Sequence, residues 1–204
     1  MSARSGGTAP GETAPIAAAR WITNGTFLWG VSSVGILDEA VELFPGGLLT
    51  TPEVRAELAR HVRERRFLAA ALSAIDAGKV TLTSLDSPEL KAFTRFRSLW
   101  QITSADSKDL GEATVITVAT QRQIGAVLDD GQARFFMEYH HPDLPLLDTP
   151  QVLLHMIGAR VFDMDRGWEL LCGMRDHGGF NHRLAGRPKG HWMDRRDYPR
   201  LVPL

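Results

Sequence analysis

Four acidic residues have positions that suit a shared site: two directly follow a predicted strand, and two lie on predicted helices. Asp129 and Asp130 directly follow the apolar run at residues 126–128, which predicts a short strand. Glu57 lies next to an apolar position of its predicted helix, and Glu112 lies between two small residues that leave room around its carboxylate. Gathered carboxylates repel one another unless a hard cation such as Mg²⁺ or Mn²⁺ neutralises them. These acids therefore predict a divalent-metal site, although each one alone is also explained as a solvated or helix-capping carboxylate.

The elements that must position these acids are predicted from hydrophobic spacing. Short apolar or alternating runs predict strands at residues 21–23, 48–49, 79–85, 126–128 and 144–147. Helical spacing predicts helices within residues 28–44, from the cap Thr51 to Gly78 without a break, from Ser87 onward, over 104–123, through 135–136, over 152–157 and over 168–174. Strands that alternate with helices predict a three-layer α/β/α fold with a mostly parallel central sheet. Ligands bind such sheets at the carboxyl ends of the strands, where Asp129 and Asp130 follow theirs.

Length and composition predict a single domain. The chain has 204 residues, of which 44% are hydrophobic and 23% are charged, and this balance is sufficient for a buried core. We expect a flexible tail over residues 1–20, the domain over 21–180 and a basic tail over 181–204. The single cysteine, Cys172, excludes an internal disulfide, and no apolar run approaches the length of a membrane-spanning helix. The sequence therefore predicts a soluble, cytoplasmic protein that does not engage a membrane.

Any attraction to nucleic acid must be local, because the formal net charge of the chain is only −1. The last segment, residues 181–204, mixes cations with aromatic residues: Arg183, Arg187, Lys189, Trp192, Arg195, Arg196, Tyr198 and Arg200. Such a mixture suits single-stranded nucleic acid, through phosphate attraction and base stacking. The alternative is that Trp192 and Tyr198 pack on the domain while the charges stay solvated.

Three motifs occur in a recognisable order: TPEVRAEL at residues 51–58, DLGEA at 109–113 and VLDDGQAR at 127–134. In this order they resemble the PIN-domain family of metal-dependent ribonucleases, which includes the toxins of toxin–antitoxin pairs. The similarity extends over residues 21–180. It implies a PIN-like fold, Mg²⁺ or Mn²⁺ as cofactor, and Glu57, Glu112 and Asp129 as the catalytic acids. Asp130 is a neighbouring candidate ligand.

The position of the family's first acid departs from that pattern. The family has an Asp-x-Ser/Thr turn at the end of its first strand, whereas this chain has Asn24-Gly25-Thr26. The resemblance makes Asn24 the altered metal ligand and Thr26 a substrate-facing hydroxyl, and we expect a turn that exposes Asn24. An amide oxygen still ligates a cation but carries no charge, so cation affinity should fall. A weakened nuclease, a non-catalytic relative and a substitution that silences a toxic nuclease are the open explanations.

Two functional hypotheses follow. The first is a Mg²⁺- or Mn²⁺-dependent ribonuclease that hydrolyses phosphodiester bonds, in one version as the toxin of a toxin–antitoxin pair. The second is a non-catalytic PIN-like module that binds RNA or a protein. Arg134, one helical turn after Asp130, either meets a phosphate or, as the simpler interpretation, pairs with Asp130. The partners to consider are RNA, an antitoxin protein and a second copy of the chain in a homodimer.

Overall fold

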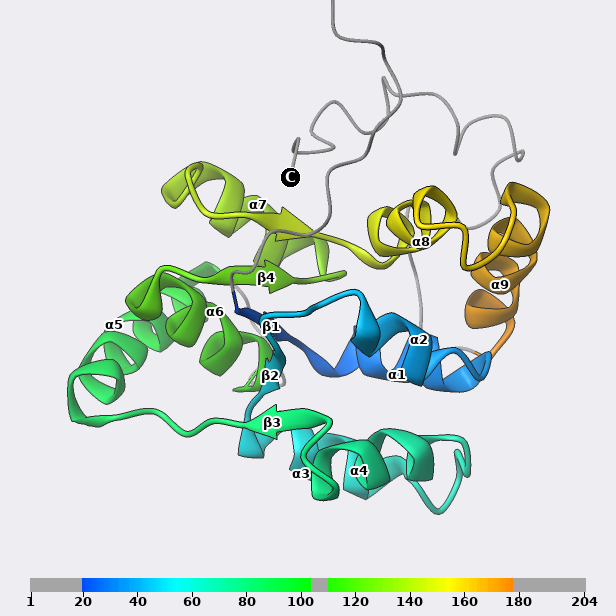
Figure 1. The fold of residues 1–204 in the computed structure, drawn as a ribbon. Coiled ribbons are helices and arrows are strands. Elements are labelled where there is room, and N and C mark those ends of the chain that lie inside the picture. Colours follow the sequence, from blue (N-terminus) through cyan, green and yellow to red (C-terminus); the bar gives the residue numbers. More distant parts are fainter. Residues whose placement is uncertain (1–19, 104–109, 178–204) are drawn as a thin grey trace, which may run out of the picture.

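A five-stranded parallel sheet forms the centre of the computed structural model, which describes residues 20–103 and 110–177 (Figure 1). The strands are β1 (Trp21–Thr23), β2 (Leu48–Thr50), β3 (Val80–Leu82), β4 (Gly125–Val127) and β5 (Leu146–Leu147). They are ordered β3-β2-β1-β4-β5. The chain builds outward from β1 to β3 and then returns to the other side of β1. The carboxyl ends of β1 and β4 therefore flank the point where the strand order reverses, which is the usual ligand crevice of such sheets.

Helices cover both faces of this sheet, which confirms the predicted three-layer α/β/α architecture (Figure 1). They are α1 (Gly25–Ser33), α2 (Leu37–Glu42), α3 (Pro52–His61), α4 (Leu68–Asp76), α5 (Ser87–Thr103), α6 (Leu110–Arg122), α7 (Gly131–His140), α8 (Thr149–Gly158) and α9 (Met164–Asp176). Residues 104–109 of the helix predicted over 104–123 lie outside the described residues. The predicted tails over residues 1–20 and 181–204, with the cations and aromatics of the second, also lie outside them, except for Arg20.

The single helix predicted from Thr51 to Gly78 is wrong. Its start is confirmed, since Thr51 caps α3 by accepting a hydrogen bond from the backbone N–H of Val54 at 3.4 Å. The helix ends at His61, however, and α4 begins only at Leu68. Residues 63–66 between them are all charged and all exposed. Without an apolar side chain to bury, this stretch has no packing that would continue a helix across it.

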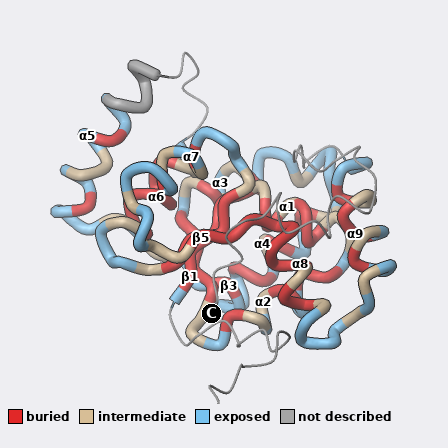
Figure 2. The backbone as a smooth tube through the Cα atoms, turned by 90° about the horizontal axis from the view of Figure 1, so that it is seen from above, coloured by how far each residue is buried: buried red, intermediate tan, exposed pale blue. Residues whose placement is uncertain are grey.

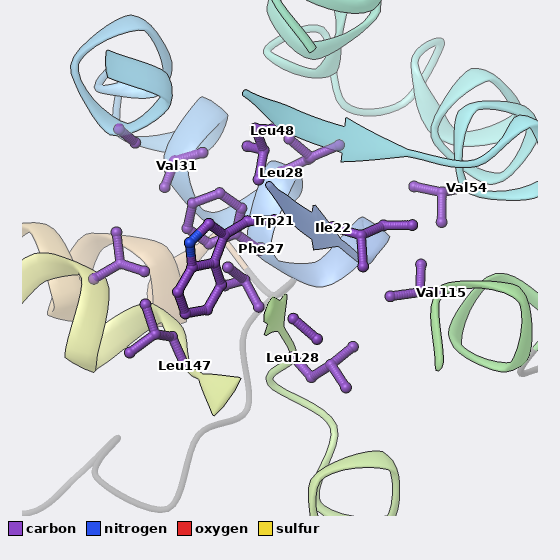
Figure 3. Close-up of a cluster of buried hydrophobic side chains, with 14 of the residues drawn as sticks. Trp21, Ile22, Phe27, Leu28, Val31, Leu48, Val54, Val115, Leu128 and Leu147 are labelled. Carbon is purple, nitrogen blue, oxygen red and sulfur yellow. The ribbon is translucent and has the colours of Figure 1, made fainter. Parts of the chain in front are cut away.

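The core is built on both faces of β1. Successive side chains of a strand point to opposite faces, and Figure 3 shows Ile22 directed toward Val54 of α3 and Val115 of α6, with Trp21 on the other side. A Cβ at Gly125 of the neighbouring strand would lie 2.5 Å from the Trp21 ring. Glycine is therefore required opposite this tryptophan. Figure 2 shows the buried residues concentrated in the strands and on the inner sides of the helices.

Within residues 20–103 and 110–177, no helix combines the length and the apolar character needed to cross a membrane.

Candidate functional site

Polar residues follow four of the strands and begin the next helices. Asn24 after β1, Thr51 after β2 and Asp148 after β5 are the N-caps of α1, α3 and α8. Asp130, after β4, is the N-cap of α7. The partly positive N-terminal ends of four helices thus face the carboxyl edge of the sheet, which favours anionic side chains there. We call this region the acidic edge and define it by Asn24 and the acids Glu57, Glu112 and Asp129.

Asn24 is fully buried, so the expectation of an exposed turn is wrong. Its Oδ1 accepts a hydrogen bond from the backbone N–H of Phe27 at 3.2 Å, which makes it a helix cap. Because Oδ1 faces the Phe27 N–H, the amide nitrogen Nδ2 is directed toward Glu112. Nδ2 donates to Oε1 of Glu112 at 3.4 Å. Asn24 and Glu112, two site positions of the resemblance that are 88 residues apart in sequence, are therefore in contact.

Glu57 reaches the same place from α3. Its half-buried carboxylate packs against two glycines at helix starts: an ideal Cβ at Gly111 would lie 3.0 Å from Glu57 Oε2, and one at Gly25 would lie 3.4 Å from it. Gly111 directly precedes Glu112 in the first turn of α6, and Gly25 directly follows Asn24. Gly111 thus keeps space for the carboxylate between α3 and α6, whereas a Cβ at Gly25 would make only an ordinary van der Waals contact with it. Three site positions of the resemblance, Asn24, Glu57 and Glu112, are therefore neighbours in space.

Asp129 is anchored to the start of α8. Its two carboxylate oxygens accept hydrogen bonds from the backbone N–H of Thr149 at 2.8 Å and from the Thr149 hydroxyl at 2.6 Å. Asp129 comes two residues after the end of β4, close to the predicted strand end, and β4 is the direct neighbour of β1. Thr149 was not identified as a functional residue from the sequence. A Thr-Pro pair after a strand indicates a helix start, but nothing in it shows that the threonine would hold an acid 20 residues earlier.

Asp130 and Arg134 do not form the predicted pair. Asp130 is exposed, and its Oδ1 accepts hydrogen bonds from the backbone N–H groups of Gln132 and Ala133 at 2.9 and 2.8 Å. Arg134 instead forms ion pairs with Asp148 at 3.4 Å and with Glu138 at 3.3 Å. Asp148 is buried, so a cation beside it offsets the cost of burying its charge. The acid that follows β5 is thus the partner of Arg134 that sequence proximity missed.

The donor types at the acidic edge fit Mg²⁺ or Mn²⁺, which take carboxylate and amide oxygens as ligands. The space that Gly111 keeps beside the Glu57 carboxylate is consistent with such a site. The amide of Asn24, however, presents its nitrogen to Glu112. In the part of the chain that the structure describes, no three or more His, Cys, Asp and Glu side chains form a metal-holding group. Thr26, the predicted substrate-facing hydroxyl, lies half-buried in the first turn of α1.

Comparisons of the chain with protein-family models, with curated proteins and with solved structures found no match. Membership of the PIN-domain family therefore stays a prediction that rests on the three motifs.

Proposed function

We propose that this chain is a PIN-like, Mg²⁺- or Mn²⁺-dependent ribonuclease whose cation site is weakened by Asn24. The contact between Asn24 and Glu112, with Glu57 packed beside them, carries the proposal. It gathers two carboxylates and one amide at the strand ends, close to the point where the strand order reverses. The three motifs at residues 51–58, 109–113 and 127–134 support RNA as the substrate.

Glu112 and Asp129 would hold the cation, with Asn24 as the altered ligand and Glu57 and Asp130 close to it. A bound divalent cation polarises a phosphodiester, lowers the pKa of a water molecule and neutralises the leaving oxygen. The chain's own contribution is positioning. Thr149 fixes both oxygens of Asp129. In the absence of a cation, the Asn24 amide provides a hydrogen-bond donor to Glu112, which a second carboxylate would lack.

A ribonuclease of this kind acts on RNA in the cytoplasm. If the chain is the toxin of a toxin–antitoxin pair, the antitoxin protein would cover the acidic edge and block access of RNA to it. A second copy of the chain in a homodimer is the other protein partner to test, by measuring the mass of the purified protein in solution.

A second candidate, a PIN-like module that binds RNA or a protein without cutting, is favoured by the orientation of Asn24. Because Oδ1 caps α1, the group aimed at Glu112 is a hydrogen-bond donor rather than a metal ligand. An amide that already satisfies Glu112 reduces the need for a cation at this position. The scaffold would then keep its shape without metal.

Cleavage assays separate the two candidates. Purified protein is incubated with single-stranded RNA and Mn²⁺, with chelator as the control, and Glu112→Gln and Asn24→Asp variants are assayed in parallel. We expect Mn²⁺-dependent cleavage that Glu112→Gln abolishes and Asn24→Asp increases. Glu169→Gln, which removes an exposed carboxylate on α9, is the matched control and should cleave like the unaltered chain. Absence of cleavage in both the unaltered chain and a folded Asn24→Asp variant would replace the nuclease with the binding module.

A further inference from the structure

A groove of about 480 Å³ lies between α5, α6 and α7. Two cations of α5, two phenylalanines and three polar side chains of α6 line it: Lys91, Arg95, Phe96, Phe136, Thr117, Thr120 and Gln121. No Asp or Glu is among the described residues that line it. Both cations are exposed. The groove therefore combines positive charge, aromatic rings and hydrogen-bonding groups.

A continuous row of ring contacts connects the outer surface of α7 with this groove. Phe135 and Tyr139 stack with their ring centres 6.1 Å apart and their planes inclined by 15°. The ring centre of His140 lies 4.9 Å from that of Tyr139 and 4.5 Å from that of Phe136. The Phe136 ring in turn meets the Phe96 ring edge-on, with their centres 4.6 Å apart. Phe135 and Tyr139 are 69% and 71% exposed. Two large rings are thus held parallel in solvent, where a further flat ring can stack on them.

The groove begins about one turn beyond Glu112 on α6 and extends away from the acidic edge toward the C-terminal ends of α6 and α7. Glu112 lies in the first turn of α6, and Thr117 of the groove follows it by about 7.5 Å along the helix axis at 1.5 Å per residue. Asp129 immediately precedes the N-cap of α7, the helix of the ring row. Figure 1 shows α5, α6 and α7 on the same side of the molecule.

We propose that this groove and ring row bind single-stranded RNA and lead it to the acidic edge. Unpaired bases stack on Phe135 and Tyr139, and phosphates pair with Lys91 and Arg95. Stacking platforms beside cations are how proteins hold single strands without reading their sequence. An acidic peptide would satisfy the cations but would leave the stacked, exposed rings without a matching flat partner. The inference rests on the proposed ribonuclease function for its substrate class.

Binding is measured on the full chain, in chelator, by the fluorescence anisotropy of a labelled single-stranded oligoadenylate. Replacing both exposed rings, Phe135→Ala together with Tyr139→Ala, should weaken binding about tenfold or more, since each stacked base contributes on this order. The rings are exposed, so thermal unfolding should change little. Val161→Ala, which trims an exposed apolar side chain beyond α8, is the matched control and should bind normally.

The cations are tested by salt dependence. Lys91→Gln combined with Arg95→Gln should make the negative slope of log K against log salt shallower by about 1.4, the value for two lost phosphate contacts on a single strand. Arg166→Gln, which removes an exposed cation of α9, should leave the slope unchanged. Duplex RNA of the same length should bind more weakly than the single strand, because its bases are already stacked.

Normal affinity in the folded double-alanine variant, or equal affinity for duplex RNA, would overturn the inference. Because binding is measured in chelator, it is independent of cleavage. Loss of oligoadenylate binding in the groove variants, together with no cleavage by any variant, supports the groove and refutes the nuclease. Cleavage with an unchanged KM in the groove variants refutes the groove and leaves the nuclease intact.

Discussion

Replacing Asn24 with aspartate would set two carboxylates against each other where the structure has an amide–carboxylate contact. The amide nitrogen lies 3.4 Å from Glu112 Oε1. At that distance two unit charges repel by about 5 kcal/mol at an effective dielectric constant of about 20, and by about 1 kcal/mol in bulk water. At about pH 7 the pair of carboxyls can avoid this repulsion by binding one proton. Raising the pKa of one carboxyl by the required three units or so costs about 4 kcal/mol, which is therefore the upper limit of the destabilisation. Since Asn24 is buried and Glu112 half-buried, we expect a loss of about 2–4 kcal/mol in the free energy of unfolding without cation.

A divalent cation should reverse this loss. In the Asn24→Asp variant, one carboxylate oxygen can keep capping α1 at the Phe27 N–H, while the other becomes an anionic ligand beside Glu112. Preferential binding to the folded state stabilises it by about 2.7 kcal/mol at a ligand concentration of about 100 Kd. Thermal unfolding at neutral pH, in chelator and in millimolar Mn²⁺, should therefore show a larger Mn²⁺-dependent rise in Tm for Asn24→Asp than for the unaltered chain. In chelator, the stability gap should narrow toward about pH 4, because one carboxyl takes up a proton.

Ala159→Glu is the matched control for this variant. It also adds one carboxylate, but at the far end of α8, about 15 Å along the helix from the acidic edge. Its Tm should not respond to Mn²⁺ more than that of the unaltered chain. If Asn24→Asp matches the unaltered chain in chelator and gains nothing extra from Mn²⁺, its side chain does not face Glu112, and the match of Asn24 to the family's first acid is wrong. Tighter Mn²⁺ binding without RNA cleavage would favour the non-cutting module.

Three further predictions test stability and the tail. Arg122→Gln should lower the free energy of unfolding, measured by urea titration, by about 3 kcal/mol, since Glu89 is buried and pairs with Arg122 at 2.7 Å. The hydrogen bond from Arg122 lowers the pKa of Glu89, so the stabilisation by this pair should persist at neutral pH and disappear only as the pH falls below about 4.5. Burial lowers the pKa of His155, so stability should fall as the pH drops below about 6.5, and His155→Leu should reduce that slope in urea titrations between about pH 5 and 7. Deleting residues 181–204 should weaken RNA binding and flatten its salt dependence with little change in Tm; a large fall in Tm would show that the tail packs on the domain.

Helix starts at the acidic edge were predictable where a cap and a proline coincide. Thr51 with Pro52 defines the start of α3 in the sequence, and the structure confirms it. Asn24-Gly25 carries no such unambiguous signal, because the same pair is typical of an exposed turn and of a helix cap. Only the buried face of α1, which includes Phe27, decides between them. The exposure of Asn24 was therefore mispredicted although the strand before it was placed correctly.

Side-chain contacts between different helices and strands could not be predicted from the local sequence. Arg134 lies four residues after Asp130, a spacing that predicts a pair on one helix face. Asp130, however, is committed to capping α7, and the buried Asp148 needs a cation more than an exposed acid does. Desolvation therefore decides the partner, and it depends on where β5 lies in the sheet. Thr149 reaches Asp129 because β4 and β5 are neighbours in the folded sheet, which the local sequence does not show.

The glycine at position 111 shows that the placement of Glu57 constrains the sequence of α6. Glycine inside a helix is less favourable than alanine by about 1 kcal/mol, so propensity alone would favour alanine in this first turn. An alanine Cβ there would lie 3.0 Å from Glu57 Oε2 and 3.2 Å from Val54 Cγ2, closer than ordinary van der Waals contact. Glycine at position 111 therefore avoids close contacts with both Glu57 and Val54 of α3. A solvated surface acid would need no such space, so Glu57 is better explained as a member of the acidic edge than as an ordinary charge on α3.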